Sequence, residues 1–405
     1  ILIPPLWPDQ NNMKFLLIYV PNLRFSSFTD SFRMYTLKEV LQRVSIPVNV
    51  DENKLYYQIG IRSHSKGIFY KEAETGKQIG NKRIFWIEPN CLILNIVFAW
   101  EQAVAKTSEK EVGMVASHRF PMYKVLNNSL DYLLDFFKTE KGKQLLQMAS
   151  PGGAGRNKTL NQDFFLNSKI YLPSLNEQLK TSKLIELIED RIETQIKIIN
   201  DYKSLKKWVN DKIYSDLKCE YLSFSSVYVI AKEGGTPSTS KSEYYSGNIP
   251  FIKIDDLNKK YITENKVNIS EQGLSNSSAW IIPKNSVIMS NGATIGNVSI
   301  NTYPVSTKQG ILGIVPKDGV LTEYLYYLLN TTDFRRNLKQ VTTKGTIDCA
   351  YIKDIDHIKV KIPELEIQKS IIQILKRIDK KIELELLILD FINKQKQYLL
   401  NNLFV

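Results

Sequence analysis

The sequence predicts a mixed α/β (α+β) chain in which two globular domains are each followed by one long coiled-coil helix, as a pseudo-two-fold internal duplication. Three observations predict this fold class. The chain contains two aligned copies of one segment, both copies have the residue spacing of a long helix, and the blocks before them alternate short strand-like runs with turns. A length of 405 residues is sufficient for two or three domains.

The repeated segment begins at Pro173 and again at Pro363, 190 residues later, and the two copies align without a gap. The residue before a proline disfavours helix, so each proline marks a helix start, and no further Pro or Gly interrupts either copy. The copies share Leu175/Leu365, Gln178/Gln368, Ile188/Ile378, Ile192/Ile382, Glu193/Glu383, Ile198/Ile388 and Lys206/Lys396.

Apolar residues recur in both copies at alternating spacings of four and three, which is the seam of a coiled coil. Two polar residues interrupt each seam at matching places, Gln195 with Glu385 and Lys206 with Lys396. Polar seam residues lower stability but fix register and orientation. We therefore interpret these four side chains as candidate register-setting residues.

The globular blocks follow one plan. In the first, residues 21–43 predict a turn-rich opening with a short amphipathic helix, and residues 44–125 predict strands, with a hairpin around Thr75 and Gly76. A helix over 130–148, a glycine-rich loop and a last strand follow. In the second, we expect a helix over 222–233, a turn, four strands, a helix over 321–341, a loop and a strand.

These patterns predict five segments. They are an N-terminal leader (1–20), a first globular domain (21–172), a first long helix (173–215), a second globular domain (216–362) and a second long helix (363–405).

Composition narrows the function. The net charge of +12 and the pI of about 9.2 favour a polyanionic partner, usually nucleic acid. The three cysteines and three histidines are scattered, which argues against a disulfide framework or a zinc site. We find no segment long and apolar enough to cross a membrane, and a reducing cytoplasm fits the cysteine usage.

The search for catalytic motifs gives a negative result. The sequence has no phosphate-binding GxxxxGK[ST] loop, no HExxH, no GxGxxG, and no Asn/Asp-Pro-Pro-aromatic signature of an amino-methyltransferase. The tripeptide ENK at 52–54 and 264–266 matches a nuclease-like acidic-x-Lys pattern, but such tripeptides are common by chance. We predict no catalytic, cofactor-binding or metal-binding residue.

Binding residues are better supported. Lys and Arg neutralise phosphates, while Arg, Asn and Gln read base edges in the major groove. On predicted turns and strand edges, the candidates for DNA binding are Arg62, Lys66, Lys82, Arg83, His118, Arg119, Arg156 and Lys158 in the first block, and Lys253, Asn291, Lys308, Gln309 and Lys344 in the second.

The arrangement resembles the specificity subunit of type I restriction–modification systems. In the second half, the stretches GGTPSTSKSEYYSGNIPFIKIDDL, STKQGILGIVP and VKIPELEIQKSI are similar to that family's target-recognition domain and the helix behind it. In the first half, PNLRFSSF, YQIGIRSHSKGI and IYLPSLNEQ resemble a more divergent copy. The segment CEYLSFSSVYVIAKEGG departs from the family, because it lacks the usual tryptophan at the entry to the second domain.

The resemblance implies that each domain reads one half of a bipartite site in double-stranded DNA. It also implies that the long helices pack antiparallel, set the spacer, and dock two methyltransferase subunits that use S-adenosylmethionine. Motor–endonuclease subunits, with ATP and Mg, would complete the complex, and this chain would be catalytically silent. In an antiparallel pair, Gln195 is expected to approach Lys396, and Glu385 to approach Lys206.

Two alternatives remain open from the sequence. One is a stand-alone DNA endonuclease with a diverged active site, and the other is a coiled-coil scaffold that binds only protein. Metal-dependent cleavage of DNA by the purified chain distinguishes the first, and the lack of any DNA footprint distinguishes the second.

Overall fold

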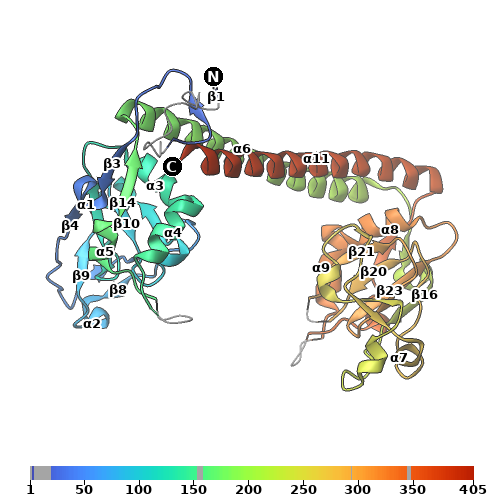
Figure 1. Cartoon of the computed structure of the whole chain (residues 1–405). Helices are drawn as coiled ribbons and strands as arrows, with labels where there is room; N and C mark the ends of the chain where they lie inside the picture. Colours follow the sequence, from blue (N-terminus) through green and yellow to red (C-terminus); the bar gives the residue numbers. More distant parts are fainter. Residues whose placement is uncertain (1, 4–19, 153–157, 293, 344–347) are drawn as a thin grey trace. The chain divides into compact units, whose positions relative to one another are not determined.

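A computed structural model of the chain describes residues 2–3, 20–152, 158–292, 294–343 and 348–405. The chain divides into two compact units (Figure 1). The first unit comprises Ile1–Gln195 together with Ile388–Val405, and the second comprises Ile196–Leu387. Each long helix therefore contributes one part to each unit.

The first unit contains many short strands and a few short helices. The strands are β1 (Leu2–Ile3), β2 (Arg24–Phe25), β3 (Arg33–Thr36), β4 (Leu41–Val44), β5 (Leu55–Tyr56), β6 (Ile59–Ile61), β7 (Ile68–Tyr70), β8 (Glu74–Thr75), β9 (Ile84–Trp86), β10 (Leu92–Leu94), β11 (Val104–Lys106), β12 (Val115–Ser117), β13 (Met122–Val125) and β14 (Lys169–Leu172). The helices are α1 (Leu37–Val40), α2 (Gly76–Ile79), η2 (Ala99–Glu101), η3 (Glu109–Glu111), α3 (Leu130–Lys138), α4 (Glu140–Met148) and α5 (Gln162–Asn167).

A four-stranded antiparallel sheet of order β11-β10-β13-β4 forms the centre of this unit, and two-stranded ribbons such as β9–β12 and β6–β7 extend from it. Leu92 and Leu94 of β10 are completely buried, as are Leu133 and Phe137 of α3, so the sheet and α3 share one core.

The second unit contains the strands β15 (Tyr221–Ser223), β16 (Tyr228–Glu233), β17 (Ile249–Ile252), β18 (Tyr261–Ile262), β19 (Val267–Ile269), β20 (Val287–Ser290), β21 (Val298–Asn301), β22 (Ser306–Thr307), β23 (Ile311–Pro316) and β24 (Lys359–Lys361). Its short helices are η4 (Phe224–Ser226), η5 (Ser242–Tyr245), η6 (Ile254–Asp256), α7 (Glu271–Ser275), α8 (Thr322–Leu329), α9 (Thr332–Gln340) and α10 (Ile352–Ile355). A five-stranded sheet of order β16-β23-β20-β21-β18 packs under α8, and β19-β17-β22 forms a second sheet.

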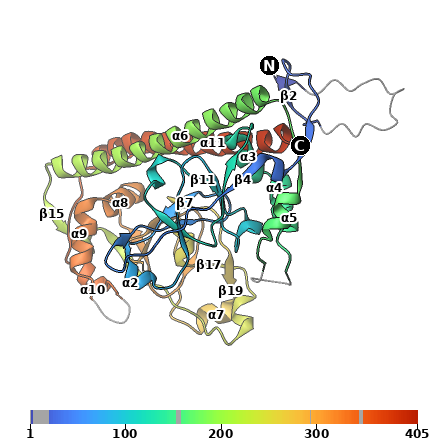
Figure 2. The same cartoon turned by 90° about the vertical axis from the view of Figure 1, so that its left-hand side faces the viewer.

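The two predicted long helices are confirmed as α6 (Leu175–Asp216) and α11 (Leu365–Leu403), which lie side by side in both views (Figures 1 and 2). In the first unit, Ile185 and Ile188 near the start of α6 share a core with Leu399 near the end of α11. In the second unit, the end of α6 packs beside the start of α11, where Ile371 is buried. The helices are therefore antiparallel, and none of the described helices meets the length and hydropathy of a membrane span.

A shared glutamine fastens each long helix to its unit. The Gln178 Oε1 atom accepts a hydrogen bond of 2.9 Å from the Ser129 backbone amide, just before α3. The Gln368 Oε1 atom accepts one of 2.9 Å from the Leu321 backbone amide, just before α8. Both glutamines also donate to the carbonyl of the helix-starting proline, and both are at most 1% exposed. The identity at this position therefore has a structural cause.

The single helices predicted over 130–148 and 321–341 are wrong in the same way. Each is two helices, α3 and α4 or α8 and α9, with a break at a threonine. The Thr139 hydroxyl accepts from the Gly142 amide, and the Thr331 hydroxyl accepts from the Phe334 amide, so each threonine begins a new helix as its N-cap.

Two further predictions are corrected. The helix expected over 222–233 is instead β15, η4 and β16, because the β-branched and aromatic residues of β16 pair with β23. Thr75 does not form a hairpin turn. Its side chain caps α2 at Gln78, while β7 pairs with β6 and β9 pairs with β12.

Candidate nucleic-acid interface

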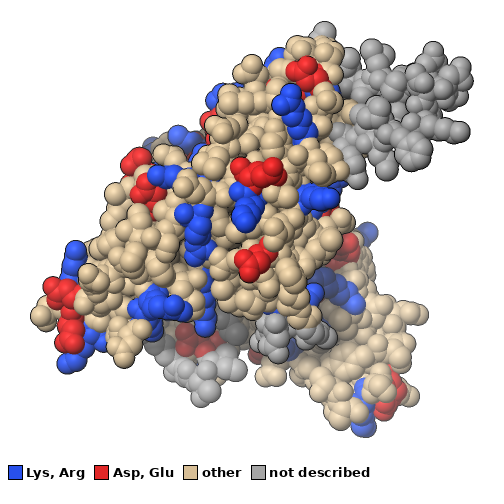
Figure 3. Space-filling view, turned by 60° about the vertical axis from the view of Figure 1, so that its left-hand side comes forward, with Lys and Arg blue, Asp and Glu red and all other residues tan. Residues whose placement is uncertain are grey.

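Positive charge is dispersed over the one face of the molecule that Figure 3 shows. On the face shown in Figure 3, Lys and Arg side chains are interspersed with Asp and Glu rather than gathered in one block. The net charge of +12 therefore does not locate a site by itself. The positions of the individual candidate side chains carry that information instead.

In the first unit, two basic turns meet at one end of the β9–β12 ribbon. Ile84 lies opposite Ser117 in this antiparallel pair, so the residues just outside it, Arg83 and His118, are neighbours. The His118 amide donates to the Arg83 carbonyl at 3.2 Å. The Lys82 and Arg119 side chains flank this contact, and all four candidate side chains are exposed.

The loop that precedes η2 joins these turns to the other candidates. The Ile96 amide donates to the Arg119 carbonyl at 2.9 Å, and the Leu160 amide donates to the Ile96 carbonyl at 2.8 Å. Lys158, two residues before Leu160, places its ammonium 5.3 Å from the centre of the Trp100 ring. A cation over an aromatic face is held in position without losing its charge.

The β6–β7 turn carries Arg62 and Lys66. His64 and Ser65 in this turn have φ angles of 59° and 53°, and their amides donate to the Glu101 and Gln102 carbonyls at 2.6 and 2.9 Å. The turn therefore packs against the end of η2, and the loop described above leads into the start of the same helix. We call the gathered residues the first loop surface: Arg62, Lys66, Lys82, Arg83, His118, Arg119 and Lys158. Arg156 lies outside the described residues.

The second unit gathers its candidates similarly. The Lys308 amide donates to the Ile252 carbonyl at 3.0 Å, which brings Lys308 beside Lys253. The Gln309 amide donates to the Thr236 hydroxyl at 3.3 Å. The second loop surface consists of the exposed candidates Lys253, Lys308 and Gln309 together with the Gly234–Pro237 turn. Lys344 lies outside the described residues.

Sequence reasoning interpreted GGTP at 234–237 as a turn and missed its place in this surface. A Cβ atom on Gly234 would lie 2.1 Å from the Thr307 carbonyl oxygen, and one on Gly235 would lie 2.3 Å from the Ala279 amide nitrogen. Only glycine allows so close an approach of two backbones. The paired glycines were the available signal, because they indicate a turn that packs directly on a neighbouring strand.

Asn291 is a correction. The predicted base-reading role requires an exposed amide, but Asn291 is 1% exposed. Its Nδ2 atom donates to the Ala350 carbonyl at 3.1 Å, and its own carbonyl accepts from the Ala350 amide at 2.9 Å. Asn291 therefore fastens the segment that ends at Ala350 to the end of β20.

The register contacts of the long helices also differ from the prediction. Lys396 donates to Glu189 at 2.6 Å in the first unit, and Lys206 pairs with Asp379 at 2.5 Å in the second. The salt-bridge partners lie six residues before the predicted ones, Gln195 and Glu385, because the helices pair in a register displaced by that amount. The two salt bridges are equivalent, since Glu189 and Asp379 are 190 residues apart, like the two lysines.

Each salt bridge belongs to a larger buried network. Asp379 also accepts from the Tyr327 hydroxyl at 2.6 Å and from Lys260 at 3.4 Å. Burial lowers the pKa of Lys260, although Asp379 and Glu323 act in the opposite direction. Burial and the hydrogen bond to Asp379 raise the pKa of Tyr327, so its hydroxyl remains a donor at neutral pH.

In the first unit, Lys138 lies between Asp135, at 2.9 Å, and Glu189, at 3.1 Å. Burial raises the pKa of Asp135 to about 6, against the effect of Lys138. Burial acts in the same direction on Glu189, but Lys138 and Lys396 together lower its pKa. These contacts hold the long helices to each other and to the globular blocks. In the part of the chain that the structure describes, no group of three or more His, Cys, Asp and Glu residues is arranged to hold a metal.

The geometry thus defines a class of protein: two α/β modules, each with basic loops gathered at one surface and each fastened to a shared helix pair. Comparison with known proteins agrees. Residues 220–394 match the family model described as the type I restriction modification DNA specificity domain. Over this stretch the chain is similar to type I restriction–modification specificity subunits.

Several relatives are informative. The MjaIX specificity subunit of Methanocaldococcus jannaschii is 35% identical over 40% of this chain, and the HindI specificity subunit of Haemophilus influenzae is 39% identical over 28%. The chain spans only 37% and 25% of the length of these two relatives. The MjaVIII specificity subunit of M. jannaschii is 25% identical over 68% of this chain and 70% of its own.

Two solved structures share the fold. A chain from a structure concerned with assembly and conformational transition of a type I R-M system has a TM-score of 0.66, with 16% identity, over 91% of this chain and 96% of that chain. The type I restriction–modification S subunit from M. genitalium has a TM-score of 0.50 and 14% identity over 95% and 99%. The predicted fold class is confirmed.

Proposed function

We propose that the chain is the sequence-reading subunit of a type I restriction–modification complex, with each loop surface reading one half of a bipartite site in double-stranded DNA. The observation that carries this proposal is the duplication. Two units with the same attachment to α6 and α11 present different exposed basic loops, held by backbone hydrogen bonds. Exposed Arg, Lys and Gln on rigid loops suit phosphate and major-groove contacts.

Selection from random duplexes tests this function. The full chain is incubated with duplexes that carry a long randomised segment, and the retained duplexes are sequenced. We expect a two-part motif with a fixed gap. Exchanging Arg83 and His118 for alanine should relax one half only, and exchanging Lys308 and Gln309 should relax the other. A single continuous motif, or none, contradicts the proposal.

We also propose that the long helices set the gap and dock two methyltransferase subunits. Trp208 on α6 and Tyr398 on α11 support this, because they are 190 residues apart and their side chains are 63% and 60% exposed. Large exposed aromatic residues are typical anchors of protein interfaces. Trp208→Ala and Tyr398→Ala should each remove one of two copurifying methyltransferase subunits, and the double variant should remove both.

Catalysis would then belong to partner subunits. We propose that methyltransferases using S-adenosylmethionine and a motor–endonuclease using ATP and Mg act around this chain, in the cytoplasm, and that the chain itself needs no cofactor. Incubating the purified chain with Mg and DNA tests this. Cleavage that is lost on mutating Glu52 or Glu264 would favour an endonuclease, and binding to protein without any DNA footprint would favour a scaffold.

A further inference from the structure

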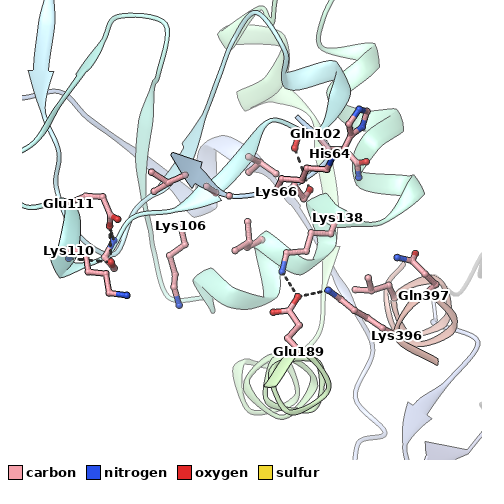
Figure 4. Close-up of a pocket in the computed structure, with 18 of the residues that line it drawn as sticks. His64, Lys66, Gln102, Lys106, Lys110, Glu111, Lys138, Glu189, Lys396 and Gln397 are labelled. Carbon is pink, nitrogen blue, oxygen red and sulfur yellow. Dashed lines mark hydrogen bonds and ion pairs between the residues drawn. The ribbon is translucent and has the colours of Figure 1, made fainter. Parts of the chain in front are cut away.

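The first unit contains a cleft of about 810 Å³ between the globular block and the long helices. Figure 4 shows the β6–β7 turn with Lys66 on one side, Lys106 and Lys110 on another, and Glu189 of α6 with Lys396 of α11 at the base. The lining is mostly polar and charged, whereas small-molecule sites are mostly apolar.

The base of the cleft does not repel an anion. Lys138 and Lys396 approach the same Glu189 oxygen, at 3.1 and 2.6 Å. The Glu189 carboxylate is therefore paired with two lysines, and the buried Asp135 also pairs with Lys138, so the base carries no excess negative charge. Because Glu189 is 39% exposed on its side chain, this base is in contact with solvent.

The rim carries positive charge that is free to bind. Lys66 and Lys110 are exposed and form no ion pair with any described residue. Glu111, the acidic neighbour of Lys110 that lines the cleft, is 3% exposed and accepts from the Tyr70 hydroxyl at 2.5 Å and the Ser108 hydroxyl at 2.7 Å. Its carboxylate is therefore turned into the protein.

The second unit fills the corresponding place with its own side chains. Lys260 pairs with Glu323, the second residue of α8, as Lys106 pairs with Asp131, the second residue of α3. However, Lys260 also reaches Tyr327 at 2.6 Å and Asp379 at 3.4 Å. Tyr327 is the sixth residue of α8, and the sixth residue of α3 is Asp135, which pairs with Lys138 instead.

This difference leaves an opening in one unit only. The Asp379 side chain is 15% exposed, against 39% for the equivalent Glu189. The opening also adjoins the first loop surface, because Lys66 belongs to both and Gln102, which lines the cleft, accepts from Ser65 in the same turn.

We propose that this cleft seats phosphate groups of the DNA backbone beside the half-site that the first unit reads, so that the first unit contacts more phosphates than the second. The proposal rests on the proposed function. The chemistry is that of a polyanion held by lysines: each phosphate contact releases a counterion, so affinity falls with salt in proportion to the number of contacts.

The test measures how the affinity of the full chain for a duplex obtained by the selection above depends on salt concentration. Lys110→Gln should make the slope of log K against log salt less steep by about 0.9, with several-fold weaker binding at about 0.1 M salt. Gln397→Trp fills the cleft from α11 without changing the charge, and it should make the slope less steep by a similar amount. Lys66 is left unchanged because it also belongs to the first loop surface.

Lys380→Gln, which removes an exposed lysine of α11 outside the cleft, is the matched control and should leave the slope unchanged. Chemical ethylation of phosphates just outside the motif, on the side of the first unit, should also interfere with binding of the wild-type chain. It should not interfere with binding of the Gln397→Trp variant. The proposal is overturned if Lys110→Gln matches the control or if Gln397→Trp keeps the wild-type slope. A selection that yields no motif would instead contradict the proposed function.

Discussion

The two units are alike where they meet the long helices and different almost everywhere else. Both use a buried glutamine to hold the helix after the last sheet strand, and both use a lysine–carboxylate pair between α6 and α11. The sheets differ, with four central strands in the first unit and five in the second. Retained residues therefore mark buried polar contacts, while the surrounding block is free to change.

Gln178 and Gln368 provide the largest expected effect. Replacing either with alanine leaves a buried amide and carbonyl unpaired, which costs roughly 3 kcal/mol. Each variant should lower the hydrogen-exchange protection of its own unit, in α3 for Gln178→Ala and in α8 for Gln368→Ala, and spare the other unit. Gln397→Ala at an exposed site is the control. Markedly unequal losses would mean that the two attachments are not equivalent.

The two salt bridges should differ in strength. Asp379→Asn disturbs a carboxylate that accepts from three side chains and is 15% exposed, so we expect a loss of about 2 kcal/mol. Glu189→Gln should cost only about 1 kcal/mol, because its side chain is 39% exposed and solvent screens the interaction. Urea unfolding of both variants at one salt concentration measures this difference, and equal losses would argue against an open cleft in the first unit.

Asp135 should make the stability of the first unit depend on pH. Its pKa is raised to about 6 by burial, above its ordinary value of 3.8. The folded state therefore binds a proton more readily than the unfolded state between these values, and stability increases as the pH falls from about 7 to 5. The second unit has Tyr327 in the corresponding place, and its phenol carries no charge in this range.

On this change of pH we expect the stability of the first unit to increase by roughly 1 kcal/mol. Hydrogen exchange of the α3 amides, corrected for the intrinsic exchange rate at each pH, measures this increase. Asp135→Asn should remove the gain, and α8 in the second unit serves as the internal reference. A gain of the same size in Asp135→Asn would assign the effect to another group.

The sequence was sufficient for the repeat and the long helices, because heptad spacing and helix-starting prolines are local signals. It was insufficient for contacts that depend on register. The partners of Lys206 and Lys396 follow from how two helices are offset, and the burial of Asn291 follows from a loop 59 residues away in sequence. The strand β16 was assigned as a helix because its partner β23 lies far along the chain.

The smallest expected effect on stability comes from substituting the threonines at which each predicted helix divides into two. Thr139 and Thr331 have the same pair of contacts: the hydroxyl donates to the Phe136 or Leu328 carbonyl at 2.7 Å and accepts from an amide of the following helix at 3.1 or 3.2 Å. Substitution of an N-cap threonine by alanine costs about 1 kcal/mol, whereas serine retains the hydroxyl. We therefore expect Thr139→Ala and Thr331→Ala to lower the protection of α4 and α9 by similar amounts, and the serine variants to restore most of it. If alanine instead joined α3 to α4 as one continuous helix with no loss, the break would be imposed by packing, and the cap would be a consequence of the fold rather than its cause.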